Sequence, residues 1–263
     1  MEKKVIADEK IKRLREFYQR ENALVTSPFI DDNLVLNRDL FEHVTRSLNI
    51  SFEDKIVLDI GCGSGMLASF FESHKAYVGL DLNRRESFQI LKAEKHGYAQ
   101  ADALKLPISD NAIDVAICMD SFEHFPDQIA ATREIKRVLK PEGFVLLSVP
   151  NYANVAGLVK SYCENIGSYE KNSWAPFDYW KPEELEHFMT SKRVRHVFDA
   201  AGFENFQRIG FDREVVVGLC PWVWHPKMPG KMASAISKSF SLVAKPLCKM
   251  WPESSLHTFW RID

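Results

Sequence analysis

Between residues 55 and 150, short apolar runs alternate with longer segments whose apolar residues recur at helical spacing. A short apolar run predicts a strand, and an amphipathic segment predicts a helix. Strands that alternate with helices favour a parallel sheet with helices on both faces. The predicted strands span 55–61, 76–82, 98–103, 112–120 and 144–150, and the predicted helices span 65–74, 85–96 and 126–140.

Amphipathic patterns also flank this region. They predict helices over 8–24 and 37–48 before the first strand, and a helix over 191–203 followed by a strand over 204–211. The residues from 151 to 182 are instead rich in tyrosine, tryptophan and phenylalanine without a regular period. We therefore expect an α/β domain that carries an aromatic insertion and a C-terminal tail.

Composition excludes several classes of protein. The net charge of −2 and the charged fraction of 27% are ordinary for a soluble globular chain and show no global attraction to nucleic acid. The five cysteines form no C-x-x-C pair, which argues against a zinc site or a dithiol motif and suits a reducing compartment. The N-terminal segment lacks the apolar stretch of a signal peptide. We therefore expect a cytoplasmic location.

A glycine-rich turn follows the first predicted strand, in the stretch "VLDIGCGSGM". Gly61, Gly63 and Gly65 permit positive φ angles and a close approach of the backbone to a ligand. Asp81 ends the next strand, at the position that contacts a ribose hydroxyl in nucleotide-binding sheets. A dinucleotide site requires a third glycine where this chain has Met66, so the nicotinamide alternative is disfavoured.

The turn resembles motif I of the class I S-adenosylmethionine-dependent methyltransferases. The resemblance continues in order through "VGLDLN", "AQADALKLPISDNAIDVAICMDSFEHF" and "REIKRVLKPEGFVLLSVPN", and so covers residues 57–151. It implies a Rossmann-like fold with a mostly parallel seven-stranded sheet. It also implies that "HTFWRI", residues 257–262, is the last strand.

The resemblance also implies roles for the residues of the glycine turn. Gly61 and Gly63 would pass close to the methionine part of the cofactor, and Asp59 would support the turn. Cys62 would be a small filler within the turn rather than a reactive thiol.

The ends of the next three strands would complete the cofactor site. Asp81 would accept hydrogen bonds from both ribose hydroxyls, and Leu82 would pack on the adenine. Asp102 would bind the exocyclic amine with Ala103 beside the ring, while Met119 would line the methionine side. Taken alone, Asp81 and Asp102 would be interpreted as ordinary carboxylates at strand ends. The ordered motifs favour the cofactor-binding role instead.

Three residues after the strand at 112–120 are candidates for the acceptor side. Asp120, Glu123 and His124 share one face if this segment is a helical turn. Their spacing resembles E-x-x-E-H in quinone-biosynthesis O-methyltransferases and small-RNA terminal 2′-O-methyltransferases, which implies a divalent cation such as Mg²⁺. Aspartate in place of the first glutamate weakens that expectation, and the alternative is that Glu123 and His124 cap the next turn.

A second histidine is a candidate for catalysis. His187 heads "HFMTSKRVRHVFDAAGF", which is similar to a stretch that faces the acceptor in many small-molecule methyltransferases. We expect His124 or His187 to take the acceptor proton, while a solvated helix histidine remains the alternative for His187. The aromatic insertion is either an acceptor lid or a satellite core.

These features predict one domain over residues 1–263 with four parts. N-terminal helices occupy 1–50, the cofactor-binding core 51–151, the acceptor-side insertion 152–190, and the C-terminal strands 191–263 with a basic insertion near 215–252. The predicted function is methyl transfer to a small-molecule or lipid-linked acceptor, at oxygen. A binding-only protein of this fold remains an alternative. Nucleic acid is not expected as a partner, because no basic stripe lines the core.

The basic insertion carries five lysines and no acidic residue between Val215 and Pro252. Drawn as a helix, it has one apolar side, formed by Met232, Ile236, Phe240, Val243 and Leu247, and an opposite side with Lys231, Lys238, Lys245 and Lys249. Pro246 is expected to kink or end this helix. The apolar side either packs on the protein or lies in the surface of an anionic membrane.

Overall fold

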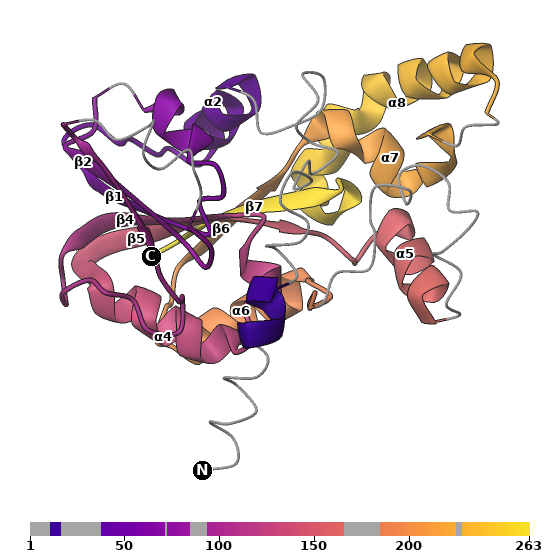
Figure 1. The fold of residues 1–263 in the computed structure, drawn as a ribbon. Coiled ribbons are helices and arrows are strands. Elements are labelled where there is room, and N and C mark those ends of the chain that lie inside the picture. Colours follow the sequence, from indigo (N-terminus) through magenta and orange to yellow (C-terminus); the bar gives the residue numbers. More distant parts are fainter. Residues whose placement is uncertain (1–10, 17–37, 72, 85–93, 166–184, 225–227) are drawn as a thin grey trace.

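A seven-stranded sheet crosses the molecule in the computed structural model, which describes residues 11–16, 38–71, 73–84, 94–165, 185–224 and 228–263 (Figure 1). The strand order is β3-β2-β1-β4-β5-β7-β6, and β7 alone runs in the opposite direction to the other six strands. The predicted Rossmann-like sheet is therefore confirmed. The strands are β1 Ile56–Ile60, β2 Ala76–Asp81, β3 His96–Gln100, β4 Ile113–Met119, β5 Leu139–Pro150, β6 Phe206–Gly210 and β7 His257–Ile262.

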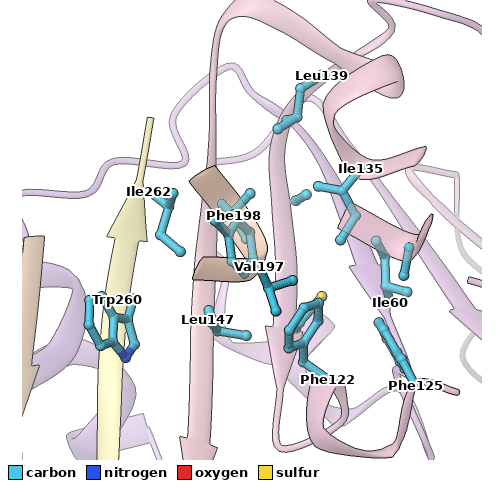
Figure 2. Close-up of a cluster of buried hydrophobic side chains, with 14 of the residues drawn as sticks. Ile60, Phe122, Phe125, Ile135, Leu139, Leu147, Val197, Phe198, Trp260 and Ile262 are labelled. Atoms are coloured by element: carbon cyan, nitrogen blue, oxygen red, sulfur yellow. The ribbon is translucent and has the colours of Figure 1, made fainter. Parts of the chain in front are cut away.

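Helices cover both faces of this sheet, as the alternating pattern predicts. Helices α4 (Gln128–Val138) and α6 (Ser191–Asp199) pack on one face, and α2 (Arg38–Ser47) and the 3-10 helix η1 (Met66–Phe70) pack on the other (Figure 1). Strand β4 is buried on both faces because its residues are almost all apolar. Figure 2 shows Phe122, Phe198 and Trp260 within the core on the α4 and α6 side.

Two of the predicted helices need correction. The helix expected over 65–74 is the short 3-10 helix η1, because Gly65 has a φ of 80° and starts the turn in the left-handed region. The helix expected over 126–140 ends at Val138, and Leu139 already begins β5. Pro141 favours this early end, because the residue before a proline is disfavoured in the helical region. The helices expected over 8–24 and 85–96 lie mostly outside the described residues.

Three helices extend the molecule beyond the sheet. They are α5 (Val155–Asn165), α7 (Val215–Leu219) and α8 (Gly230–Met250), and α7 contacts both of the others (Figure 1). The short 3-10 helix η4 (Asp212–Glu214) leads from β6 into this helical unit, and η6 (Pro252–Ser254) leads from α8 to β7. A third 3-10 helix, η5 (Pro221–Trp224), lies between α7 and α8. The basic insertion thus lies between β6 and β7, as predicted.

Pro246 was expected to kink or end helix α8, and the helix does not end there. It continues to Met250, with Pro246 exposed. A proline removes the hydrogen bond to the carbonyl four residues earlier, which here belongs to Leu242. Leu242 is 82% exposed, so that carbonyl lies on the side of the helix that water reaches. The helix can therefore continue without burying an unpaired backbone group.

Gly157 on α5 provides a test of how this helical unit attaches to the sheet. A Cβ atom there would lie 2.3 Å from the Cα atom of Tyr152, which follows β5. We expect Gly157→Ala to reduce the free energy of unfolding by about 1–3 kcal/mol, because backbone must move to relieve the contact. Gly230→Ala is the matched control, since a Cβ atom at Gly230 meets nothing within 4 Å. Urea denaturation measures both, and equal stability of the two variants would contradict the tight contact.

Candidate functional site

The glycine turn lies at the carboxyl edge of the sheet. Gly61, Gly63 and Gly65 all have positive φ angles, of 78°, 53° and 80°. Gly61 is required because a Cβ atom there would lie 2.5 Å from the Cβ atom of Ser121. At Gly63 a Cβ atom would meet nothing within 4 Å, so the backbone of the turn borders open space. Such a turn lets a ligand approach the main chain directly.

Asp81 connects the end of β2 to this turn. Its carboxylate accepts hydrogen bonds from the backbone N–H groups of Gly63 and Asn83, both at 2.9 Å. The side chain is buried, yet each carboxylate oxygen can accept a second hydrogen bond. Asp81 therefore fixes the turn and retains acceptor capacity toward a ligand at the sheet edge.

Asp59 lies beneath the turn rather than in it. The hydroxyl of Tyr77 on β2 donates to Asp59 Oδ2 at 2.6 Å. Burial raises the pKa of Asp59 to about 7, although the hydrogen bond from Tyr77 opposes the rise. Next to the turn, Cys62 packs towards Gly79, where a Cβ atom would lie 3.0 Å from the sulfur. Cys62 thus fills space between β1 and β2.

The remaining residues predicted for the cofactor follow β2, β3 and β4. Leu82 and Ala103 are half-buried, and Ala103 packs against the core. Asp102 Oδ1 accepts from the N–H group of Leu104 at 2.9 Å, which closes a tight turn after β3. Met119 is buried at the end of β4. These residues all follow strands whose carboxyl ends meet at the same edge.

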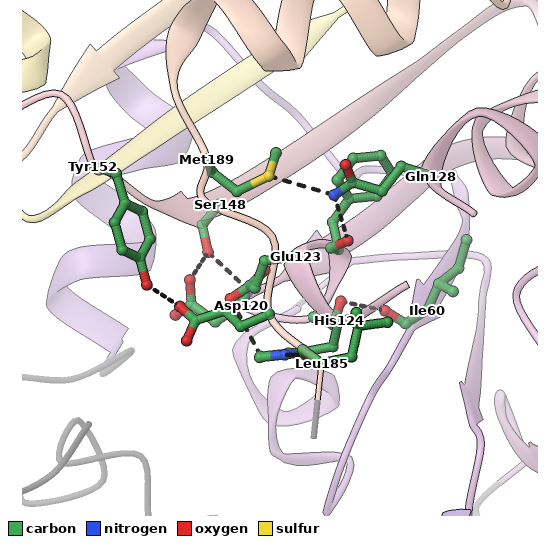
Figure 3. A network of polar contacts seen from close by, with 12 residues as sticks. Ile60, Asp120, Glu123, His124, Gln128, Ser148, Tyr152, Leu185 and Met189 are labelled. Carbon is green, nitrogen blue, oxygen red and sulfur yellow. Dashed lines mark hydrogen bonds and ion pairs between the residues drawn. The ribbon is translucent and has the colours of Figure 1, made fainter. Parts of the chain in front are cut away.

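Asp120 ends β4 in a strained conformation. Its φ is 47°, in the left-handed region that a residue other than glycine seldom adopts. Ser148 on β5 stabilises this conformation, because its hydroxyl donates to Asp120 Oδ1 at 2.7 Å and accepts from the Asp120 N–H at 3.0 Å (Figure 3). The next residues form only the 3-10 helix η2 (Phe122–His124). The expected helical turn with three residues on one face is therefore wrong.

The divalent-cation site expected from Asp120, Glu123 and His124 is not supported. Asp120 bonds to Ser148, while one nitrogen of His124 bonds to the carbonyl of Leu185 at 2.8 Å. In the part of the chain that the structure describes, no three His, Cys, Asp or Glu side chains form a group that could hold a metal ion.

His124 and Glu123 form a buried pair at this edge (Figure 3). A carbonyl oxygen only accepts hydrogen bonds, so Nδ1 of His124 carries the proton that bonds to Leu185. Nε2 of His124 then lies 3.6 Å from Glu123 Oε1. Burial raises the pKa of Glu123 far above its usual range, although His124 opposes the rise and Asp120 adds to it. The second oxygen of Glu123 is buried and has no hydrogen-bond partner among the described residues.

A second buried charge cluster, absent from the sequence predictions, lies beside this pair. Lys160 on α5 forms an ion pair with Glu186, at 2.7 and 2.8 Å, and also donates to the hydroxyl of Tyr152. Burial opposes ionisation of Glu186, but Lys160 and His124 outweigh it and lower the pKa of Glu186. The apolar sequence around Lys160 is the one signal for this cluster, since a lysine at a buried helix position requires a charged partner.

His257 also reaches this edge because β7 runs antiparallel. The first residue of β7 therefore lies next to the last residues of β5. His257 Nδ1 is 2.9 Å from Glu214 Oε1, and both side chains are buried. Burial lowers the pKa of His257, but the carboxylates of Glu214, Asp120 and Glu123 outweigh it and raise that pKa to about 9.

His187 has a structural role, contrary to its expected place as a proton acceptor. Nε2 of His187 lies 3.1 Å from the carbonyl of Phe125, so Nε2 carries the proton. Nδ1 then accepts from Arg193 at 3.1 Å, and the His187 N–H donates to the carbonyl of Glu123 at 2.9 Å. With both ring nitrogens in use, His187 holds its segment against η2.

With this geometry established, comparison with known proteins identifies the family. A family model described as a methyltransferase domain matches residues 35–208, which is more than half of the chain. The chain therefore belongs to the methyltransferase domain family, and it has the fold of the class I S-adenosylmethionine-dependent methyltransferases. This family selects the methyltransferase interpretation of the glycine turn over the nicotinamide one.

Individual relatives agree with this family. An uncharacterized methyltransferase of Mycobacterium sp. strain JLS is 31% identical over 134 residues, which are 50% of this chain and 52% of the relative. A ubiquinone biosynthesis O-methyltransferase of Haemophilus ducreyi is 33% identical over 129 residues, 44% of this chain and 54% of the relative. The chain thus matches about half the length of these curated relatives.

A solved structure supports the fold alone. The phosphoethanolamine N-methyltransferase 2 of Haemonchus contortus is 15% identical, with a TM-score of 0.58. The likeness covers 95% of this chain and 59% of that chain. At this level of identity the comparison extends the shared fold to the helical unit but does not transfer a substrate.

The pair of His257 and Glu214 predicts how stability depends on pH. The pKa of His257 is about 9 in the folded state and near 6.5 when unfolded, so folding takes up a proton between these values. The stabilisation is complete below pH 6.5 and is lost as the pH rises through 9. We expect the wild type to lose about 3 kcal/mol more than His257→Gln across this range.

Urea denaturation at several pH values between 6 and 9.5 measures this difference. His196→Gln is the matched control, because His196 is exposed at the end of α6. Its stability curve should run parallel to that of the wild type. Parallel curves for His257→Gln and the wild type would exclude the ion pair as a source of pH dependence.

Proposed function

We propose that this protein transfers the methyl group of S-adenosylmethionine to an oxygen atom of a small-molecule or lipid-linked acceptor in the cytoplasm. The observation that carries this proposal is His124, whose Nδ1–H is bonded to a backbone carbonyl while Nε2 remains beside a buried carboxylate. Such a group is suited to accept the proton that a hydroxyl acceptor must lose.

The residues at the glycine turn fit the cofactor. The open space beside Gly63 suits the methionine end of S-adenosylmethionine, and the carboxylate of Asp81 at the end of β2 suits the two ribose hydroxyls. Leu82 and Ala103 would pack against the adenine, with Asp102 near its amine and Met119 on the methionine side. When bound, the cofactor supplies an electrophilic methyl group on a positively charged sulfur.

His124 would remove the acceptor proton. Its side chain is 17% exposed, whereas Glu123 beside it is 3% exposed, so His124 is the member of the pair that an acceptor can reach. The hydrogen bond to Leu185 orients the ring, and Nε2 is the nitrogen that would take the proton. Since the transfer itself is a direct displacement, the protein mainly has to align the acceptor oxygen and hold this proton.

Glu123 would stabilise the protonated ring. In its carboxylate form, Glu123 Oε1 would lie 3.6 Å from the charged Nε2 of His124 and would attract that charge. Asp120 is exposed at the end of β4, where its carboxylate faces the same edge.

The acceptor class is supported by a relative and by the described part of the aromatic insertion. The Haemophilus ducreyi relative carries the name of an O-methyltransferase of ubiquinone biosynthesis, which suits a small apolar acceptor with a hydroxyl group. In this chain the rings of Tyr152 and Phe188 stack with centroids 4.5 Å apart beside the Lys160 cluster. Residues 166–184 of the predicted lid lie outside the described residues.

Asp81 provides the test of the cofactor site. We expect Asp81→Asn to weaken binding of S-adenosylhomocysteine by about tenfold or more, because charge-assisted hydrogen bonds to ribose are lost. Asp54→Asn is the matched control, since Asp54 is exposed in a turn far from the sheet edge and its φ of 54° suits asparagine. Titration calorimetry with NAD as the comparison ligand measures both. Unchanged affinity in Asp81→Asn would remove Asp81 from the ribose role.

His124 provides the test of catalysis. We expect His124→Ala to reduce kcat by about 10²–10⁴-fold, with the affinity for S-adenosylhomocysteine unchanged. His196→Ala is the control for loss of a histidine, because the side chain of His196 is exposed on α6. Turnover is measured with a panel of catechol, hydroxyquinone and polyprenyl-linked phenol acceptors. A variant with wild-type kcat would exclude His124 as the base, and no turnover by the wild type with any acceptor would favour the binding-only alternative.

A further inference from the structure

Helix α8 divides into a buried side and an outer side. Ala244 and Cys248 are buried, and Ile236, Phe240 and Leu247 are half-buried against the apolar clusters around α7. For these residues the predicted packing of the apolar stripe on the protein is correct. Met232 and Val243, expected on the same side, are instead 51% and 50% exposed. The apolar surface of α8 is therefore wider than the protein covers.

The outer side of α8 is both basic and apolar. Lys231, Lys238 and Lys245 follow one another at seven-residue intervals on one face, and Lys249 adds to them one turn later. All four are exposed, and no acidic residue lies between Val215 and Pro252. Leu242 and Met250 lie near these lysines on the same helix, and their side chains are 82% and 84% exposed.

Exposed apolar side chains concentrate on the helical unit as a whole. Among the described residues, eight of the nine large apolar side chains that are exposed come from α5, η5, α8 and the residue that follows α8. The ninth is Phe188. The eight are Leu158, Tyr162, Trp222, Met232, Leu242, Val243, Met250 and Trp251. The described residues of the sheet and of α2, α4 and α6 contribute no exposed large apolar side chain, so this set marks one end of the molecule (Figure 1).

We propose that the outer side of α8, together with Trp222 and Trp251, docks on the surface of an anionic phospholipid bilayer. The lysines match the negative charge of the headgroups, and the leucine, valine and methionine side chains enter the boundary with the acyl chains. Tryptophan prefers the interface between water and lipid. In the described part of the chain, no helix is long and apolar enough to cross a membrane.

A bilayer fits this surface better than nucleic acid does. Lysines alone would suit a phosphate backbone, but nucleic acid offers no environment for Leu242 and Met250, which are the most exposed apolar side chains of the described chain. A lipid surface uses both kinds of residue. Because α5 and α8 are joined through α7 to the edge that carries Tyr152 and His257, docking would bring that edge close to lipid-linked acceptors.

Vesicle sedimentation tests the charges. Full-length protein is mixed at low salt with vesicles of phosphatidylcholine alone or with 30 mol% phosphatidylglycerol, a composition chosen for the ~−30 mV range of anionic leaflets. We expect sedimentation with the anionic vesicles, reduced at least about tenfold in Lys238→Glu/Lys245→Glu. Lys75→Glu/Lys95→Glu is the matched control, because both lysines are exposed at the opposite edge of the sheet and the change in net charge is the same.

A second variant tests the apolar part of the surface. We expect Leu242→Ser/Met250→Ser to weaken vesicle binding about tenfold, with the protein still folded because both side chains are exposed. No sedimentation of the wild type, or equal loss in the Lys75→Glu/Lys95→Glu control, would overturn the proposal. Vesicle binding that ignores the apolar changes, with equal binding to duplex DNA, would overturn it in favour of nucleic acid. None of these measurements depends on methyl transfer.

Discussion

The parallel direction of β1, β2, β4 and β5 is the constraint on which the site depends. Their carboxyl ends lie at one edge, so the loops that follow all four strands meet there. The hydrogen bond from Gly63 N–H to Asp81 joins the first two loops, and that from Ser121 to the carbonyl of Ile60 joins the first and third. These two side chains thus hold the glycine turn in addition to the backbone hydrogen bond from Gly65 to Cys62 within it.

The same edge concentrates buried charge. Strand β7 brings His257 back to it, while α5 and the segment before α6 contribute Lys160 and Glu186. Removing one partner of such a buried pair leaves an uncompensated charge, which costs far more than the pair contributes. Burial raises the pKa of Glu123 strongly, and the two buried cations nearby do not offset this rise because they pair with other carboxylates. Lys160 pairs with Glu186, and His257 pairs with Glu214.

The raised pKa of Glu123 has a consequence for stability. Burial raises this pKa from 4.5 to about 8 in the folded state, so the unfolded chain releases the proton at a lower pH than the folded chain does. The contribution of Glu123 therefore becomes less favourable to folding as the pH rises from 4.5 through 8.

Sequence patterns predicted the sheet because burial on both faces makes β4 almost continuously apolar, and they predicted the turn because only glycine tolerates its φ angles. They could not predict the role of His187, since its ring nitrogens bond to Phe125 and Arg193 through tertiary contacts. Spacing likewise suggested a metal site, but the left-handed φ of Asp120, fixed by Ser148 on another strand, directs that carboxylate elsewhere. Local pattern fixes which residues follow each strand, whereas partners on distant strands decide where their side chains point.

Helix α8 also shows how far a sequence pattern can predict which side chains are buried. Its period of 3.6 residues correctly placed Ile236 and Phe240 against α7, yet the stripe drawn from sequence also included Met232 and Val243. The reason is geometric, because α7 is a single short helix of five residues and cannot cover a helix of 21 residues along its whole apolar side. It is their position next to lysines and without acidic neighbours, rather than their exposure alone, that matches the proposed docking on an anionic bilayer.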